Sequence, residues 1–392
     1  MTDLLLRNVR PMGGAATDVL VLQGRIAEGP APAGIATEDG RGALLLPGFV
    51  EGHTHLDKTT LHQPDWLVNE VGPRIIDKID TEREWRARTG HDAGAASLAL
   101  ARAFLAQGTT RIRSHVDVDT SGGTQHVERV LQTREAMKDV QDIQVVAFPQ
   151  SGILARQGTD SLLDAALAMG ADIVGGLDPC AIERDPVRHL DIVFRLAEKH
   201  AKPVDIHLHE PGSMGAFSLE LILERTRALS MQGRVVVSHA FCLGDIPERE
   251  RDTLLGQMAE LGVAIATTAS ASRPVPLVAP CRAAGVTIFG GNDGIRDTWT
   301  PYGSPDMLER AMLIGLRNNF RRDDEVALAF DCVSRAGAAG CGFVDHGLAP
   351  GARAELVLVE ARTLAEAVVA RPARRVVVSG GRVVARNGAL VA

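Results

Sequence analysis

The sequence predicts an α/β protein, a (β/α)8 TIM barrel carrying a small β-sandwich domain that both ends of the chain build together. In the middle of the chain, short apolar β-branched runs alternate with amphipathic stretches, and polar side chains follow many of those runs. Both ends instead alternate apolar and polar residues with a period of two. We therefore expect the sandwich to comprise residues 1–47 and 345–392, and the barrel residues 48–344.

The barrel is predicted from eight strand-like runs separated by helix-like segments. The runs cover residues 49–56, 110–119, 143–152, 172–179, 203–210, 234–241, 263–270 and 286–293. Four intervening segments, residues 94–108, 126–139, 189–201 and 219–229, carry apolar residues at the spacing of a helix that covers a sheet. An open doubly wound sheet is the rival. The absence of GxGxxG after the first run and the polar residues at many run ends favour the barrel.

The flanking segments predict antiparallel strands. Near the start, LLLRNVR and VLVLQGRIAEG alternate, with Gly24 and Arg25 at a turn. Near the end, AELVLVEA and RRVVVSGGRVVARNGALVA do the same, and Ser379 to Gly381 mark a hairpin. We favour one joint domain over two separate β extensions.

Composition and charge indicate which kinds of partner and which compartment to expect. The net charge of −7 is mild and the basic residues are dispersed, which argues against a nucleic-acid partner. No apolar stretch is long enough for a membrane span, and the start lacks the pattern of a signal peptide. The five cysteines form no CxxC pair, so we expect reduced thiols in a cytoplasmic protein.

Histidines and acids gather where the predicted strands end. His53 and His55 share one face of the first strand because a strand places residues i and i+2 on the same side. The fifth run ends in IHLHE with His207, His209 and Glu210, the sixth in SHAF and the eighth in GGND. A lone histidine at a strand end is usually structural. Several such histidines together with two acids, at the ends of four strands, indicate a metal or substrate site.

The segments HTHLDK, HLHE, SHAF and GGNDGIRDTW, in this order, resemble the amidohydrolase superfamily over essentially the whole chain. HVDVD, IQVVAFPQSG and GGLDP are typical of its branch of cytosine deaminases and N-isopropylammelide isopropylamidohydrolase. The resemblance implies one divalent ion, zinc or iron, bound by His53, His55, His207 and Asp293. The fourth run ends in GGLDPC without a lysine, which favours a mononuclear site.

The same resemblance implies three catalytic roles. Asp293 accepts a proton from the water that the metal activates. Glu210 carries a proton to a ring nitrogen of the substrate, and His239 orients the nucleophile. The reaction is then hydrolytic removal of an amine from a ring carbon.

Substrate contacts are expected from two residues. Gln150 would bind the amide edge of the ring, because its side chain both donates and accepts. Trp299 would form an apolar wall. Asp297 is expected behind the direct contacts, His115 either there or at the pocket rim, and His209 either touches substrate or is structural. Lys58 is expected at the rim or in a loop ion pair with Asp57.

The two branches differ at several motif positions, and this sequence matches one branch at some of them and the other branch at the rest. Glu210 matches the cytosine deaminases, whereas SHAFC and NDGIRDTWTPYGSPDM match the triazine branch. Gly294 stands where cytosine deaminases carry a second aspartate, so we expect free space there and a larger or substituted ring.

The leading expectation is thus a cytosine deaminase-like hydrolase of C–N bonds in cyclic amidines, acting on a small pyrimidine-like heterocycle. The alternative is an N-alkyl aminotriazine amidohydrolase that releases an alkylamine. A cyclic amidase and a non-catalytic metal-binding scaffold are less favoured. The sequence leaves open whether the chain forms a homo-oligomer.

Overall fold

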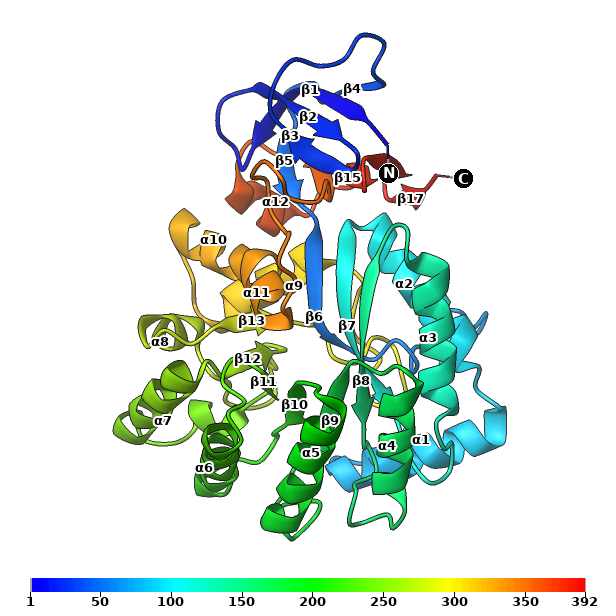
Figure 1. Cartoon of the computed structure of the whole chain (residues 1–392), viewed down its shortest axis with the longest axis vertical. Coiled ribbons are helices and arrows are strands. Elements are labelled where there is room, and N and C mark those ends of the chain that lie inside the picture. The colour runs from blue at the N-terminus through cyan, green and yellow to red at the C-terminus, as the bar shows by residue number, and fades with distance from the viewer. Residues whose placement is uncertain (1, 392) are drawn as a thin grey trace.

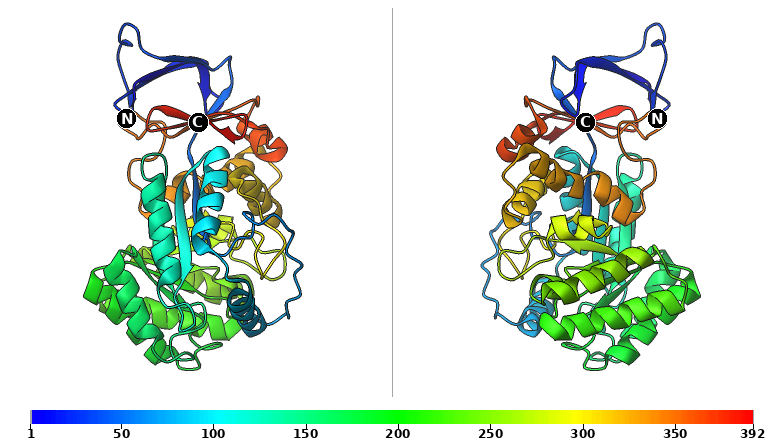
Figure 2. Two further views of the ribbon diagram at one scale, coloured as in Figure 1. Left: turned by 90° about the vertical axis from the view of Figure 1, so that its right-hand side faces the viewer. Right: turned by 90° about the vertical axis from the view of Figure 1, so that its left-hand side faces the viewer.

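The computed structural model describes residues 2–391 as a closed barrel with a separate sheet stacked on one end (Figure 1). Two further views show the same stacking (Figure 2). The eight parallel strands pair in the order β13-β12-β11-β10-β9-β8-β7-β6. Their bounds are β6 Phe49–Thr54, β7 Thr109–Asp117, β8 Asp142–Phe148, β9 Ile173–Leu177, β10 Val204–His207, β11 Val235–Ser238, β12 Ala264–Thr267 and β13 Ile288–Gly290. All eight predicted runs contain a strand, and the predicted fold class is confirmed.

The barrel closes between its first and last strands through a short seam. Thr54 and Asp293 form an isolated parallel bridge, and the amide of Asp293 donates to the carbonyl of His53 at 2.8 Å. No longer ladder joins β6 to β13 in the part of the chain that the structure describes. Closure at this seam therefore brings the first-strand histidines beside Asp293.

Helices cover the outside of the barrel. They are α1 Ile75–Thr89, α2 Ala93–Ala106, α3 Gln125–Met137, α4 Thr159–Met169, α5 Pro186–His200, α6 Gly212–Ala228, η1 Phe241–Gly244, α7 Glu248–Leu261, α8 Val278–Ala283, α9 Met307–Arg317, α10 Asp323–Cys332 and α11 Arg335–Cys341. The four predicted helical segments correspond to α2, α3, α5 and α6. Local sequence sets their starts: the Asp92 side chain accepts from the amides of Gly94 and Ala95 and caps α2.

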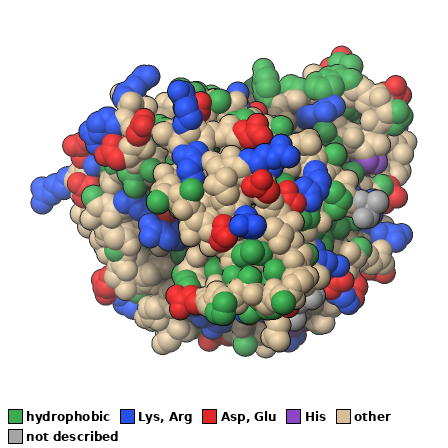
Figure 3. All heavy atoms as spheres, turned by 90° about the horizontal axis from the view of Figure 1, so that it is seen from above, with side chains coloured by type: hydrophobic (Ala, Val, Ile, Leu, Met, Phe, Trp, Pro, Cys, Tyr) green, Lys and Arg blue, Asp and Glu red, His purple; other side chains and the backbone are tan. Residues whose placement is uncertain are grey.

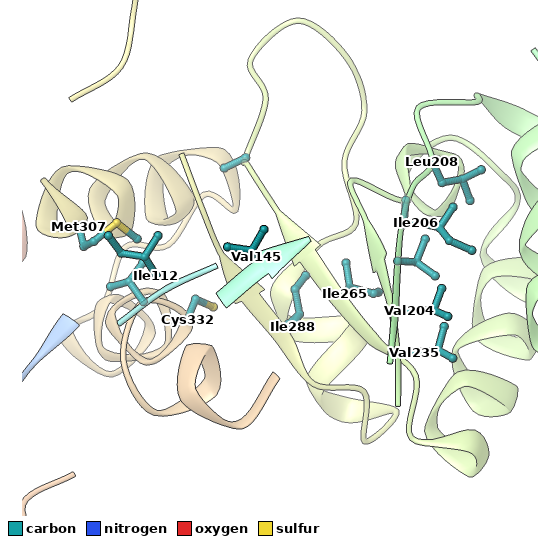
Figure 4. Packing of buried hydrophobic residues seen from close by; sticks show 14 of the residues in the cluster. Ile112, Val145, Val204, Ile206, Leu208, Val235, Ile265, Ile288, Met307 and Cys332 are labelled. Carbon is teal, nitrogen blue, oxygen red and sulfur yellow. The ribbon is translucent and has the colours of Figure 1, made fainter. Parts of the chain in front are cut away.

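An apolar core fills the space between the strands and these helices. Figure 4 shows part of it, where Val204, Ile206 and Val235 from neighbouring strands lie close together. These side chains are almost fully buried, so their transfer from water is a large favourable contribution to folding. The described part of the chain contains no helix that is both long and apolar enough to cross a bilayer.

Strands from both ends of the chain form the second sheet. Its strands are β1 Leu4–Pro11, β2 Thr17–Leu22, β3 Arg25–Ala27, β4 Thr37–Asp39, β5 Leu44–Pro47, β14 Leu356–Val359, β15 Arg374–Ser379, β16 Arg382–Arg386 and β17 Ala389–Leu390, and α12 Leu364–Ala370 joins β14 to β15. β5 pairs antiparallel with β14, and this pairing unites the two ends. β1 pairs with β2 from Leu4 to Val9, with β4 along its first half and with β5 at its end.

One apolar cluster is shared by strands from both ends of the chain, among them β1, β5, β14 and β15. At the β15–β16 hairpin, Gly380 and Gly381 both have positive φ, as the tight turn requires. Seen from the end that carries this sheet, basic and acidic side chains are interspersed over the surface (Figure 3). One joint domain therefore accounts for both flanks, while its expected limits at residues 47 and 345 stay a prediction.

A buried ion pair ties the sheet to the barrel. Arg111 lies on β7, its Nε donates to Glu355 at 2.7 Å, and its Nη2 donates to Asp345 at 2.7 Å. Arg111 and Glu355 are 1% and 2% exposed. A buried guanidinium that loses a carboxylate partner pays an uncompensated desolvation cost.

Glu355→Ala is expected to lower the free energy of unfolding by about 3 kcal/mol, because it leaves Arg111 buried with one fewer partner. Urea unfolding measures this. Glu38→Ala is the control, since its pair with Arg386 lies at the surface; it should cost less than about 1 kcal/mol. Equal losses in the two variants would contradict the account.

Candidate active site

A cavity of about 700 Å³ lies where the barrel strands end. Its lining includes His55 after β6, Gln150 after β8, His207 at the end of β10, Thr268 after β12 and Asp293 after β13. The carboxyl end of β6 points away from the second sheet (Figure 1). The cavity therefore occupies the face of the barrel where loops from many strands converge.

Five imidazoles pack together at the inner end of this cavity. The ring of His53 lies 4.0 Å from that of His115, 4.6 Å from His207 and 4.9 Å from His239, measured between centroids. The ring of His55 lies 5.6 Å from that of His207. The rings come from β6, β7, β10 and the residue after β11, so the constellation depends on barrel closure.

Two groups at this centre have ligand atoms that could converge on one ion. The ligand atoms of His53, His55 and His207 lie within 4.8 Å of one another, and so do those of His53, His239 and Asp293. Nε2 of His55 is 3.2 Å from Oδ1 of Asp293. A third group, His53 with His115 and Asp205, meets the same limit. In that group, however, Asp205 already accepts from other side chains.

The protonation states suit a cation. Nε2 of His53, Nδ1 of His55 and both ring nitrogens of His207 and His239 are buried without a hydrogen-bond partner among the described residues. Burial lowers the pKa of His53 to about 3 and brings the pKa of His207 and of His239 well below the usual value. Neutral imidazoles with unused lone pairs are what a borderline divalent ion binds.

Asp293 complements these rings. Burial acts to raise its pKa, but the hydrogen bond from His55 and the neighbouring histidines outweigh burial and bring the pKa well below the usual value. The carboxylate is therefore ionised at neutral pH. Three or four imidazoles and one carboxylate form a donor set that fits zinc or iron(II).

A chain of hydrogen bonds fixes the tautomer of His53. The hydroxyl of Ser238 donates to Oδ1 of Asp205 at 2.6 Å, so its oxygen accepts from Nδ1 of His53 at 2.9 Å. Nη1 of Arg113 donates to Oδ2 of Asp205 at 3.0 Å. Nε2 of His53 is thereby left with its lone pair toward the cluster. Sequence reasoning missed Asp205, whose only signal was its position two residues before His207 on one strand.

Glu51 spans the seam beneath the site. Its Oε1 accepts from the amide of His53 at 2.9 Å and from that of Asn292 at 3.0 Å. Its Oε2 accepts from Nδ2 of Asn292 at 2.6 Å, and Arg310 donates to the same amide side chain. Burial raises the pKa of Glu51 to about 7. Because Asn292 precedes Asp293, one carboxylate positions candidate ligand residues on both sides of the seam.

Glu210 and His209 have different surroundings after β10. Oε1 of Glu210 accepts from the amides of Cys180 and Ala181, each at 2.7 Å, and Oε2 accepts from Ser218. Glu210 does not line the cavity, whereas His209 does. Nδ1 of His209 lies 2.8 Å from Oδ2 of Asp178, so it carries the proton and leaves the Nε2 lone pair free.

The expected rim position of Lys58 is wrong. Lys58 is 4% exposed, and its ammonium lies 3.1 Å from Oδ1 of Asp117 and 3.5 Å from Oε2 of Glu82. It also donates to Oε1 of Gln150 and lines the cavity. Asp57, its expected partner, instead binds His126 at 2.7 Å. A salt-bridged loop lysine and a buried one look alike in sequence.

The expected free space beside Gly294 is wrong as well. A Cβ at this position would collide with Oδ2 of Asp297, which occupies the space itself. Asp297 is buried on the cavity wall rather than behind it, and burial raises its pKa to about 6. Trp299 also lines the cavity, and its indole N–H donates to Oε2 of Glu82 at 2.6 Å.

A protein-family model described as the amidohydrolase family matches residues 36–385. The chain belongs to this family. A solved structure of N-isopropylammelide isopropylaminohydrolase from Burkholderia multivorans is 64% identical, with a TM-score of 0.97 and full coverage of both chains. N-isopropylammelide isopropyl amidohydrolase of Pseudomonas sp. strain ADP is 31% identical over 360 residues, covering 90% of this chain and 89% of its own length.

A 5-methylcytosine deaminase from Klebsiella pneumoniae, solved with 5-fluorocytosine, is 25% identical with a TM-score of 0.84 over 97% of each chain. Among these relatives of the amidohydrolase family, the aminotriazine enzymes match more strongly than the cytosine-type enzyme. The comparisons thus favour the alternative expectation over the leading one.

His55→Ala and His207→Ala are each expected to retain less than about a tenth of the parent's metal after the same dialysis against a weak chelator, because each removes a ligand. Elemental analysis of purified protein measures this. Both variants should also melt at lower temperature, since an ion that binds only the native state stabilises it. The control is His200→Ala, which removes a histidine paired with Asp164 on the outside of the barrel. Full metal content in both site variants would refute the assignment.

Proposed function

We propose that this amidohydrolase removes an alkylamine from an N-substituted aminotriazine related to N-isopropylammelide. Water replaces the amine: the ring C–N bond breaks, a ring C=O forms, and the amine leaves with the protons it needs. The main support is the full-length 64% identity to an enzyme named for this substrate. Asp297 beside Gly294 adds to it, because that carboxylate leaves no room for the second aspartate of the cytosine-type pattern.

We propose that His53, His55, His207 and Asp293 hold one divalent ion, zinc or iron. When bound, the ion supplies a water of lowered pKa, so that hydroxide is available near neutral pH. The buried, unpartnered ring nitrogens and the ionised Asp293 support this set. The backbone at Asp293 has φ of +66°, a strained conformation that the seam around it holds in place.

The protein's own groups then handle protons and orientation. Asp293, ionised and hydrogen-bonded to His55, can accept a proton at its carboxylate. The ring of His239 lies 4.3 Å from the ring of His209, which follows β10. Its ring nitrogens have no other partner among the described residues, so it can orient the attacking water and stabilise developing charge on oxygen.

Proton delivery to the leaving amine is assigned to His209 in place of Glu210. Asp178 holds Nδ1–H of His209, so Nε2 faces the cavity and can relay a proton there. Both carboxylate oxygens of Glu210 accept hydrogen bonds, one from the amides of Cys180 and Ala181 and the other from Ser218. Glu210 thereby connects the loops that follow β9 and β10. The two candidate roles are separable by matched substitutions.

His209→Asn is expected to lower kcat at least about a hundredfold with metal content unchanged, because it removes the proton relay. Glu210→Gln keeps the shape and should lower kcat less than about tenfold. Rates of amine release and elemental analysis on the same preparations measure both. The reverse order, with Glu210→Gln the more damaging, would return the role to Glu210.

The substrate assignment is tested by a panel of ring amines. N-isopropylammelide, ammelide, cytosine and 5-methylcytosine are incubated with metal-loaded protein, and alkylamine or ammonia is quantified. We expect N-isopropylammelide to have the highest kcat/KM. Turnover of the cytosines without turnover of either ammelide would overturn the proposal in favour of pyrimidine deamination.

The cysteines support the cytoplasmic location that we propose. All five are unpaired, and four of them are buried. Burial raises the pKa of Cys242, Cys281 and Cys332 to about 12 in each case, which makes these thiols poorly reactive.

A further inference from the structure

Lys58 controls which atoms of Gln150 face the cavity. The ammonium of Lys58 approaches Oε1 of Gln150, and an ammonium can only donate hydrogen bonds. The amide of Gln150 is therefore held with its oxygen toward Lys58 and its NH2 group away from it. No described residue accepts a hydrogen bond from that NH2 group, and Gln150 lines the cavity.

Charged neighbours keep Lys58 in this place. Asp117 from the end of β7 and Glu82 from α1 flank its ammonium, and Arg86 bridges both carboxylates. Burial works against the charge, but Asp117 and Glu82 outweigh it and raise the pKa of Lys58. The ammonium is charged at any working pH, so its hydrogen bond to Oε1 of Gln150 does not depend on pH.

At Gln150 the result is a wall that offers donors only, because the NH2 group is the side of the amide turned away from Lys58. The ammonium of Lys58 itself is taken up by Gln150, Asp117 and Glu82. A glutamine free to rotate could instead pair with a lactam edge, where an N–H donor adjoins a C=O acceptor. A donor placed against this wall would leave both partners unpaired, which is costly in a buried site.

We propose, on the basis of the proposed function, that Lys58, by holding the oxygen of Gln150, selects rings that turn an acceptor toward the NH2 group of Gln150, such as an oxo oxygen of an ammelide. Replacement of that oxo group by an amino group turns an acceptor into a donor and is disfavoured. Lys58 is thus a positioning residue, and it acts on specificity by fixing the orientation of Gln150.

The test compares cyanuric acid, which has oxo groups at all three ring carbons, with ammeline, which has one oxo and two amino groups. Dissociation constants for the metal-loaded protein are measured by calorimetry over minutes, with released ammonia monitored to exclude turnover of ammeline. We expect cyanuric acid to bind at least about tenfold more tightly than ammeline. Equal affinities, or tighter binding of ammeline, would overturn the inference.

Substitutions locate the source of the preference. Lys58→Met frees the amide of Gln150 to rotate, so the ratio of the two dissociation constants should fall to less than about threefold. Lys78→Met removes a lysine from the same cavity without touching Gln150 and should leave the ratio within about twofold of the parent. A ratio that Lys58→Met leaves unchanged would overturn the inference.

Lys58→Met removes a buried charge and can fail to fold. Gln150→Glu is the second variant: its acceptor-only carboxylate can pair with Lys58 and turns an acceptor toward the ring. We expect it to invert the preference toward ammeline, and an unchanged preference would overturn the inference. Amine release from N-isopropylammelide by the parent protein tests the proposed function separately. If the parent releases the amine but shows no preference for cyanuric acid over ammeline, the inference alone is refuted. If it shows the preference but releases no amine, the proposed function alone is refuted.

Discussion

The carboxylate of Glu51 is the contact on which the site depends most. The barrel closes between β6 and β13 through one short bridge at Thr54 and Asp293, and Glu51 lies buried beneath it. It accepts from the amides of His53 and Asn292 at once and so ties the first-strand histidines to the residue before Asp293. In other pairs of neighbouring strands, a regular ladder performs this task. Here a side chain performs it, through hydrogen bonds from the backbone amides of His53 and Asn292 and from the side-chain amide of Asn292.

Two chemically different halves meet at the cavity. On the side of the histidines, burial keeps His53, His207 and His239 neutral and the hydrogen bond from His55 keeps Asp293 ionised, so the electrostatics favour a cation. On the opposite side, Lys58 and Arg86 pair with Glu82 and Asp117 within a buried network. Such a network holds side chains in one geometry. Gln150, which contacts Lys58, and Trp299, which donates to Glu82, are therefore held in fixed positions at the cavity.

The barrel could be predicted from the sequence because it follows from local periodicity, and so could the meeting of His53, His55, His207 and Asp293 at one end of it. His53 and His55 share a face by strand geometry, and the carboxyl ends of parallel strands meet wherever the chain travels between them. The position of Lys58 could not be predicted in this way. Its burial is set by Glu82 on α1 and Asp117 on β7, which are distant in sequence. The position of Asp297 depends on a local turn that the sequence does not reveal: its carboxylate accepts from the amides of Trp299 and Thr300 and fills the space beside Gly294. For Glu210, the motif position could be recognised, but not the hydrogen bonds that its carboxylate accepts from backbone amides.

The central claim is that barrel closure gathers His53, His55, His207 and Asp293 around a single divalent ion. Crystals of protein purified with its metal, measured above and below the absorption edge of the metal found by elemental analysis, test this most directly. We expect one anomalous peak per chain, located among these four side chains. A peak beside His115 and Asp205, two peaks in the cavity, or a peak outside it would show that the ion is bound differently.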